Sequence, residues 1–81
     1  MYSRNTPAAV KNRLQKRNTA HLINQFIETG KMIDAGHPDS NIYEVRGWLM
    51  DELESRNPEA FSAWLEQDHS EDTDLFKFFG Y

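Results

Sequence analysis

The chain has 81 residues and a formal net charge of −4, and 38% of its residues are hydrophobic and 12% aromatic. A chain of this length builds one small core, so we expect a single domain over residues 1–81 rather than a disordered chain. The absence of cysteine excludes a disulfide framework, a thiolate metal site and a cysteine nucleophile. No apolar run has the length of a membrane span or of a secretory signal, so we expect a cytoplasmic protein.

Charge is distributed unevenly along the chain. Residues 1–20 contain five basic residues and no acidic residue, whereas residues 44–74 contain ten acidic residues and two arginines. Two halves of opposite sign can attract each other within the fold, bind separate partners or join two copies in a homodimer. The sequence leaves these three outcomes open.

A first helix is predicted over residues 7–29. Thr6 followed by Pro7 is the usual order of a capping residue and a proline at the first helical position. Gly30 is a typical residue at which a helix ends. The residues before this helix, 1–6, are expected to be flexible.

The apolar positions of this first segment do not form one stripe. Val10 and Leu14 lie on one side of the helix, whereas the later apolar residues centre on a side rotated by well over ~100°: Leu22, Ile23, Phe26 and Ile27. The helix therefore either breaks near Asn18 or continues with its two halves facing different neighbours. We expect the first half to be the less buried one.

A second helix is predicted over residues 41–56, where Asn41 and Glu44 have the spacing of a capping box. Arg46 lies inside its apolar stripe and Trp48 on the opposite side. An arginine in such a stripe either extends to solvent or pairs with a carboxylate, and we predict a structural pairing with an acidic residue of the C-terminal half. Trp48 either packs under the C-terminal segment or is partly exposed, and if exposed it is the first candidate for a partner contact.

A third helix is predicted over residues 58–67, because Asn57 is a capping residue and Pro58 suits the first helical position. Residues 68–73 form an acidic linker. The aromatic segment that follows forms either one short helical turn or an extended tail. We expect it to fold back onto the core, and the alternative is an exposed tail that docks into a partner.

Together these elements predict an all-α fold, a small single-domain bundle of three main helices with a C-terminal aromatic segment packed on it. Short connections favour antiparallel neighbours. The predicted core consists of Leu22, Phe26, Ile27, Ile42, Val45, Leu49, Leu53, Phe61, Trp64, Leu65, Leu75 and Phe79.

The sequence offers little chemistry for catalysis. No serine lies in a nucleophile-elbow motif, and the four glycines are isolated, which excludes a glycine-rich phosphate loop. His69 stands among acidic residues, but this stretch lacks the spacing and the central glycine of a calcium-binding loop. We therefore assign no catalytic, cofactor-binding or metal-binding residue and expect no enzyme and no cofactor. A small metal-dependent enzyme around His69 is the third-ranked hypothesis.

A basic N-terminal helix is typical of nucleic-acid binding, because cations and amide side chains contact phosphates and bases. The candidate residues are Arg4, Lys11, Arg13, Lys16 and Arg17. The acidic net charge of the chain argues against this function, and a solvated helix face that complements the acidic half is the simpler interpretation.

The stretch RGWLMDELESRNPEAFSAWLE, from Arg46 to Glu66, together with RNTPAAV near the start, resembles small uncharacterised helical accessory proteins of bacterial phages and mobile elements. The resemblance implies an accessory role and provides no catalytic residue. We predict a non-enzymatic interaction module that binds a protein partner through its acidic helical surface, with nucleic-acid binding as the alternative. The predicted partner-binding residues are Trp48, Asp51, Glu52, Glu54 and Glu59.

Overall fold

The computed structural model describes residues 6–36, 41–68 and 71–81, which form helices and contain no strand. The helices are α1 (Ala8–Gln15), α2 (Thr19–Asp34), α3 (Ile42–Arg56), α4 (Pro58–Glu66) and α5 (Asp74–Phe78). The predicted all-α fold is confirmed. The flexibility expected at the N-terminus concerns residues that, apart from Thr6, lie outside the described ranges.

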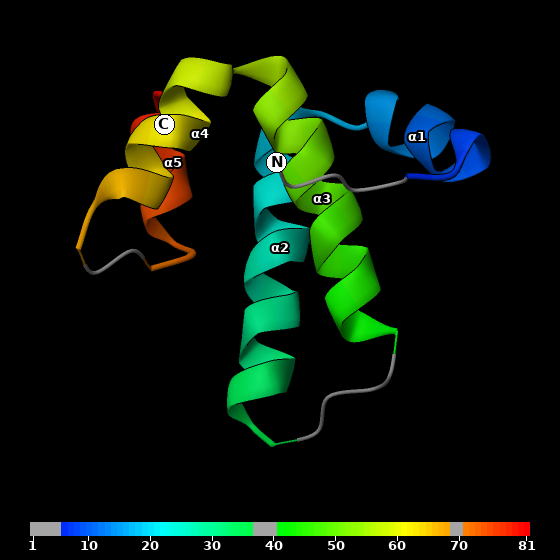
Figure 1. The fold of residues 1–81 in the computed structure, drawn as a ribbon, viewed down its shortest axis with the longest axis horizontal. Helices are drawn as coiled ribbons and strands as arrows, with labels where there is room; N and C mark the ends of the chain where they lie inside the picture. The colour runs from blue at the N-terminus through cyan, green and yellow to red at the C-terminus, as the bar shows by residue number, and fades with distance from the viewer. Residues whose placement is uncertain (1–5, 37–40, 69–70) are drawn as a thin grey trace.

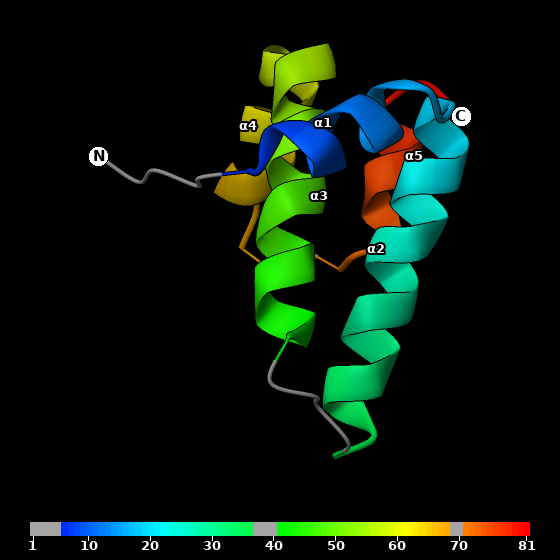
Figure 2. The same cartoon turned by 90° about the vertical axis from the view of Figure 1, so that its right-hand side faces the viewer.

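Helices α2 and α3 lie side by side and antiparallel, and they form the centre of the molecule (Figure 1). Helix α1 packs against α3 on one side of this pair, whereas α4 and α5 pack on the opposite side (Figures 1 and 2). The molecule therefore has two different flanks around one central pair. No helix within the described ranges is both long and apolar enough to cross a membrane, and the cytoplasmic location stays a prediction.

The helical segment expected over residues 7–29 is two helices, so the break near Asn18 is the alternative that the structure shows. The side chain of Asn18 caps α2, because its Oδ1 accepts a hydrogen bond from the backbone N–H of His21 at 2.8 Å. The break lets Leu14 and Ile23 both reach the core, although they would lie on opposite sides of a continuous helix. Gly30 does not end the helix, which continues to Asp34 and is followed by Gly36 with a φ of 79°, a left-handed conformation that favours glycine.

Local capping chemistry is partly as predicted. Asn57 accepts a hydrogen bond from the backbone N–H of Ala60 at 3.1 Å, and Pro58 is the first residue of α4. Thr6 is not a cap: its hydroxyl donates instead to Oδ2 of Asp51 on α3 at 3.0 Å. Asn41 holds the N-cap position of α3 but makes no side-chain capping bond.

One hydrophobic core joins all five helices of the described chain. Its fully buried members include Leu22, Phe26, Leu53, Phe61 and Leu75. Two expectations fail here. The core contains Ile23 and Leu14, which were not predicted. Leu65 was predicted to be buried but is 51% exposed, because α4 turns Ala60, Phe61 and Trp64 toward the core and Leu65 lies beside that face.

The C-terminal aromatic segment belongs to the fold. It forms the short helix α5, whose Leu75 is fully buried between α4 and α2. Phe76, Phe78 and Phe79 pack against the core, and only Tyr81 is largely exposed among these residues. The prediction that this segment folds back is confirmed.

Candidate functional site

Described residues on each flank of the α2–α3 pair line a hollow, and these two hollows are of similar size. The polar hollow has a volume of about 530 Å³ and is lined by Ile27, Gly30, Lys31, Ile33, Asp34, Arg46, Glu71, Asp72 and Thr73. The second hollow, here called the α1 groove, has a volume of about 500 Å³ and is lined by Val10, Arg13, Leu14, Arg17, Gln25, Glu28, Thr29, Val45, Trp48 and Leu49. The contacts of the lining residues distinguish the two.

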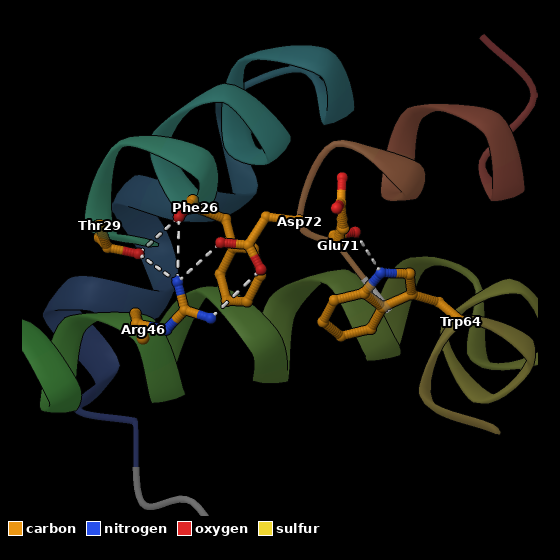
Figure 3. A network of polar contacts seen from close by, with 6 residues as sticks. All are labelled: Phe26, Thr29, Arg46, Trp64, Glu71 and Asp72. Atoms are coloured by element: carbon orange, nitrogen blue, oxygen red, sulfur yellow. Dashed lines mark hydrogen bonds and ion pairs between the residues drawn. The ribbon is translucent and has the colours of Figure 1, made fainter. Parts of the chain in front are cut away.

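Arg46 is fully engaged within the protein at the polar hollow (Figure 3). Its two terminal nitrogens donate to the two carboxylate oxygens of Asp72 at 3.1 and 3.4 Å, and Nη1 also donates to Oγ1 of Thr29 at 2.9 Å. The guanidinium carbon lies 4.0 Å from the centre of the Phe26 ring. The predicted pairing of Arg46 with an acidic residue of the C-terminal half is confirmed, and its role is structural.

Two further residues, Gly30 and Trp64, contribute to the position of the chain that precedes α5. A Cβ atom on Gly30 would overlap Oδ2 of Asp72 and lie 3.2 Å from Nη1 of Arg46, so the glycine leaves room for the ion pair. On the same flank, the indole N–H of Trp64 donates to the carbonyl oxygen of Glu71 at 2.8 Å (Figure 3). The contacts at the polar hollow therefore hold α3 and the C-terminal segment together.

The α1 groove has an apolar floor and a polar rim. Val10, Leu14 and Leu49 form the floor with Trp48, which is half-buried and whose indole N–H donates no hydrogen bond within the described residues. This position settles an alternative left open by the sequence, because Trp48 shares a hollow with residues of α1 and α2 and with none of the C-terminal segment. A half-buried aromatic residue in an open recess remains accessible to a ligand.

The rim of the α1 groove carries cations without an internal counterion. Arg13 lines the groove and is exposed. Lys11 on α1 and Lys16 in the turn after it are also exposed, but they do not line the groove. Within the described chain none of the three forms an ion pair. Among the described residues, the guanidinium of Arg17 has one hydrogen-bond partner, the imidazole of His21 at 2.9 Å. The acidic half therefore does not neutralise α1 through ion pairs of the described residues, while the candidate Arg4 lies outside the described ranges.

The opposite rim of the groove is formed by α2. Glu28 is exposed there, and its recorded partner is the exposed Lys31 at 3.6 Å. Oε1 of Gln25 is buried and has no hydrogen-bond partner among the described residues. A buried acceptor without a donor is unusual in proteins and calls for a physical reason.

The acidic residues predicted to bind a partner do not form one surface. Glu52 is 7% exposed and pairs with Nε of Arg56 at 2.9 Å, so its predicted role in an exposed partner-binding surface is wrong. Asp51 accepts the hydrogen bond from Thr6, and Glu54 is half-buried. Glu59 is exposed in the first turn of α4, on the opposite flank from α1.

Arg56 also secures α1. Its Nη2 donates to the carbonyl oxygen of Leu14 at 2.8 Å, and its Nη1 donates to Oγ1 of Thr19 at 3.2 Å. One side chain of α3 thus binds the end of α1 and the start of α2. Periodicity does not reveal this role, because Arg56 lies far from both residues in the sequence.

The described residues contain no group of three histidine, cysteine, aspartate or glutamate side chains that could hold a metal ion. His69, the centre of the metal hypothesis, lies outside the described residues, and its neighbour Asp72 is bound to Arg46.

Comparison with known proteins gives no identification: no protein-family model, no curated protein and no solved structure matches the chain. The resemblance to small accessory proteins of phages and mobile elements stays a prediction.

Proposed function

We propose that this chain is a non-enzymatic interaction module that binds a partner protein through the α1 groove. One observation carries the proposal: half-buried Trp48 lies in an apolar recess beside Arg13 and Arg17, which have no carboxylate partner within the described chain. Tryptophan and arginine are the residues most enriched at the centres of protein interfaces.

The polar hollow supports the choice of the α1 groove by contrast. There the guanidinium of Arg46 is already bound to Asp72 and Thr29, so it is not available to recognise a partner. The proposal of a non-enzymatic role rests on the sequence, which contains no cysteine, no nucleophile-elbow motif and no glycine-rich phosphate loop.

Nucleic-acid binding is the second candidate, and the exposed cations Lys11, Arg13 and Lys16 favour it, because cations without internal partners are available to phosphates. Three features make it the weaker candidate. The chain has a net charge of −4, the groove floor is largely aliphatic, and Glu28 on the rim would repel a phosphate backbone.

Site-specific photo-crosslinking in the cells that encode the chain tests the proposal. A benzoylphenylalanine is placed at position 28, on the groove rim, and in a matched control at Ser62, an exposed position of α4 on the opposite flank. We expect a discrete, nuclease-resistant adduct from position 28 and none from position 62.

Other adducts have defined meanings. A nuclease-sensitive adduct would support the second candidate, and an adduct of twice the mass of the chain would show a homodimer. Equal labelling from both positions, or no adduct from position 28, would contradict the proposal. Backbone amide shifts during addition of duplex DNA, single-stranded DNA and RNA at low and moderate salt then show whether α1 binds nucleic acid.

A further inference from the structure

Resting on the proposed function, we infer that the α1 groove binds an acidic amphipathic segment of a partner protein. Its apolar side chains insert between α1 and α2, beside Trp48 of α3, and its carboxylates lie along the α1 rim, where Arg13 and Arg17 meet them. The inference adds a chemical class and an orientation of the ligand to the proposed site.

The shape of the groove fits apolar side chains. Its volume of about 500 Å³ lies within the roughly 300–1,000 Å³ that is typical of ligand sites. The floor combines aliphatic side chains of α1 and α3, such as Leu14 and Leu49, with the ring of Trp48. Such a recess is what an amphipathic helix or an extended segment fills with one to three anchor residues.

The charges on the two rims of the groove determine where the ligand carries its acidic residues. Arg13 and Arg17 are exposed on the α1 side and have no carboxylate partner within the described residues. Guanidinium groups bind carboxylates through paired hydrogen bonds. Glu28 on the α2 side disfavours acidic residues there, so the carboxylates of the ligand lie along one edge only.

Gln25 provides an independent reason to expect a peptide. Its Oε1 is buried without a hydrogen-bond partner in the wall of the groove. Because Gln25 lines the groove, we assign an N–H group of the bound ligand as the donor to this oxygen. Peptide segments carry such donors along the backbone.

Synthetic amphipathic peptides are the probe for this inference. One set carries leucine, phenylalanine or tryptophan anchors at helical spacing and glutamates along one edge, and two matched sets carry glutamine or lysine at the same positions. Binding to the isotopically labelled full chain is followed by the shift of the Trp48 indole N–H and of the Gln25 side-chain amide. We expect the glutamate set to bind at least about tenfold more tightly than the lysine set at low salt and to lose this preference at high salt.

Charge variants test the orientation of the ligand. Arg13→Glu combined with Arg17→Glu is expected to weaken the binding of the glutamate peptides by about tenfold. Lys16→Glu, which makes the same kind of change outside the groove, is expected to have a much smaller effect. Glu28→Lys is expected to strengthen binding by a few-fold, a gain that damage to the fold would not produce.

Gln25→Leu separates binding from stability. We expect it to weaken peptide binding several-fold while leaving the unfolding midpoint unchanged or higher, because it removes an acceptor that has no partner in the free protein. Equal binding of the glutamate and lysine sets at the Trp48 signal would overturn this inference and leave the proposed function intact. Failure of every peptide to shift that signal, together with a negative crosslink from position 28, would overturn both.

Discussion

The two flanks of the α2–α3 pair each contain a tryptophan, in opposite environments. Trp64 is 5% exposed, its ring contacts those of Phe26 and Phe61, and its indole N–H donates to the carbonyl oxygen of Glu71. Trp48 is half-buried in the α1 groove, and its indole N–H has no acceptor within the described chain.

The arginines of the two flanks differ in the same way. Arg46 binds a carboxylate, a hydroxyl and an aromatic ring of the protein itself, whereas Arg13 on the opposite flank binds no acidic group of the described residues. Residue type is therefore a poor guide to function in this chain. The internal partners of each side chain distinguish the flank of Trp64 and Arg46, here called the closed flank, from the flank of the α1 groove, here called the open flank, where we propose that a ligand binds.

The largest effect is expected from the loss of the buried tryptophan. Trp64→Ala should lower the free energy of unfolding by about 3–5 kcal/mol, which is a large part of the roughly 4–12 kcal/mol expected for a chain of this length. Trp48→Ala, the matched change on the open flank, should cost clearly less. Urea denaturation followed by far-ultraviolet circular dichroism measures both variants.

Fluorescence provides a second measure of the same contrast. Trp48 alone, in Trp64→Phe, should emit at longer wavelength and be quenched more readily than Trp64 alone, in Trp48→Phe. Equal emission and equal quenching of the two variants would contradict the distinction between the flanks.

The next largest loss of stability is expected from the removal of Arg56, which should also disturb the open flank. Breaking a buried ion pair costs about 3–5 kcal/mol, and the cost should be lower here because the side chain of Arg56 is 20% exposed. Arg56→Met leaves Glu52 buried without a cation and frees the end of α1, so the amide signals of α1 should shift most. Combining it with Glu52→Gln should recover part of the stability, and an additive loss would show that the buried charge is not the cause.

The ion pair of the closed flank should respond unequally to the loss of each partner. Asp72→Ala should cost about 1.5–3 kcal/mol, the range for a hydrogen bond to a charged group, because it leaves the guanidinium of Arg46 without a carboxylate. Arg46→Met should cost less, since methionine keeps the packing on Phe26 and Asp72, which is 24% exposed, regains contact with water. Thermal and urea unfolding of the two variants give the comparison, and a greater loss from Arg46→Met would contradict it.

The smallest effect concerns Gly30. Alanine ordinarily stabilises a helix by about 1 kcal/mol relative to glycine, but in this chain its Cβ would displace Asp72 from Arg46. Gly30→Ala should therefore give little or none of that gain in the natural chain and most of it in the Asp72→Ala variant. A double-mutant cycle measures this coupling, and equal effects of Gly30→Ala in both backgrounds would rule out the steric role.

The candidate site was only partly predictable from the sequence. Trp48 stood out because it lies off the apolar stripe of α3, and Arg46 because it lies within that stripe. The α1 groove itself was not foreseen, since its walls come from three helices whose packing no local pattern records. Gln25 carried no signal in the sequence, because an unpartnered acceptor is recognisable only when its surroundings are known.

The sequence by itself determined the all-α fold, the start of α4 at Asn57 and Pro58, and the need of Arg46 for a carboxylate, because periodicity, capping and charge burial act over a few residues. Only the tertiary structure decided which of the apolar residues are buried: Ile23 joins the core and Leu65 does not. It also placed Glu52 in the interior, with Arg56 as its partner. Whether a residue is buried, and which residue it pairs with, depends on neighbours that are distant in the chain. No short stretch of sequence therefore determines either outcome.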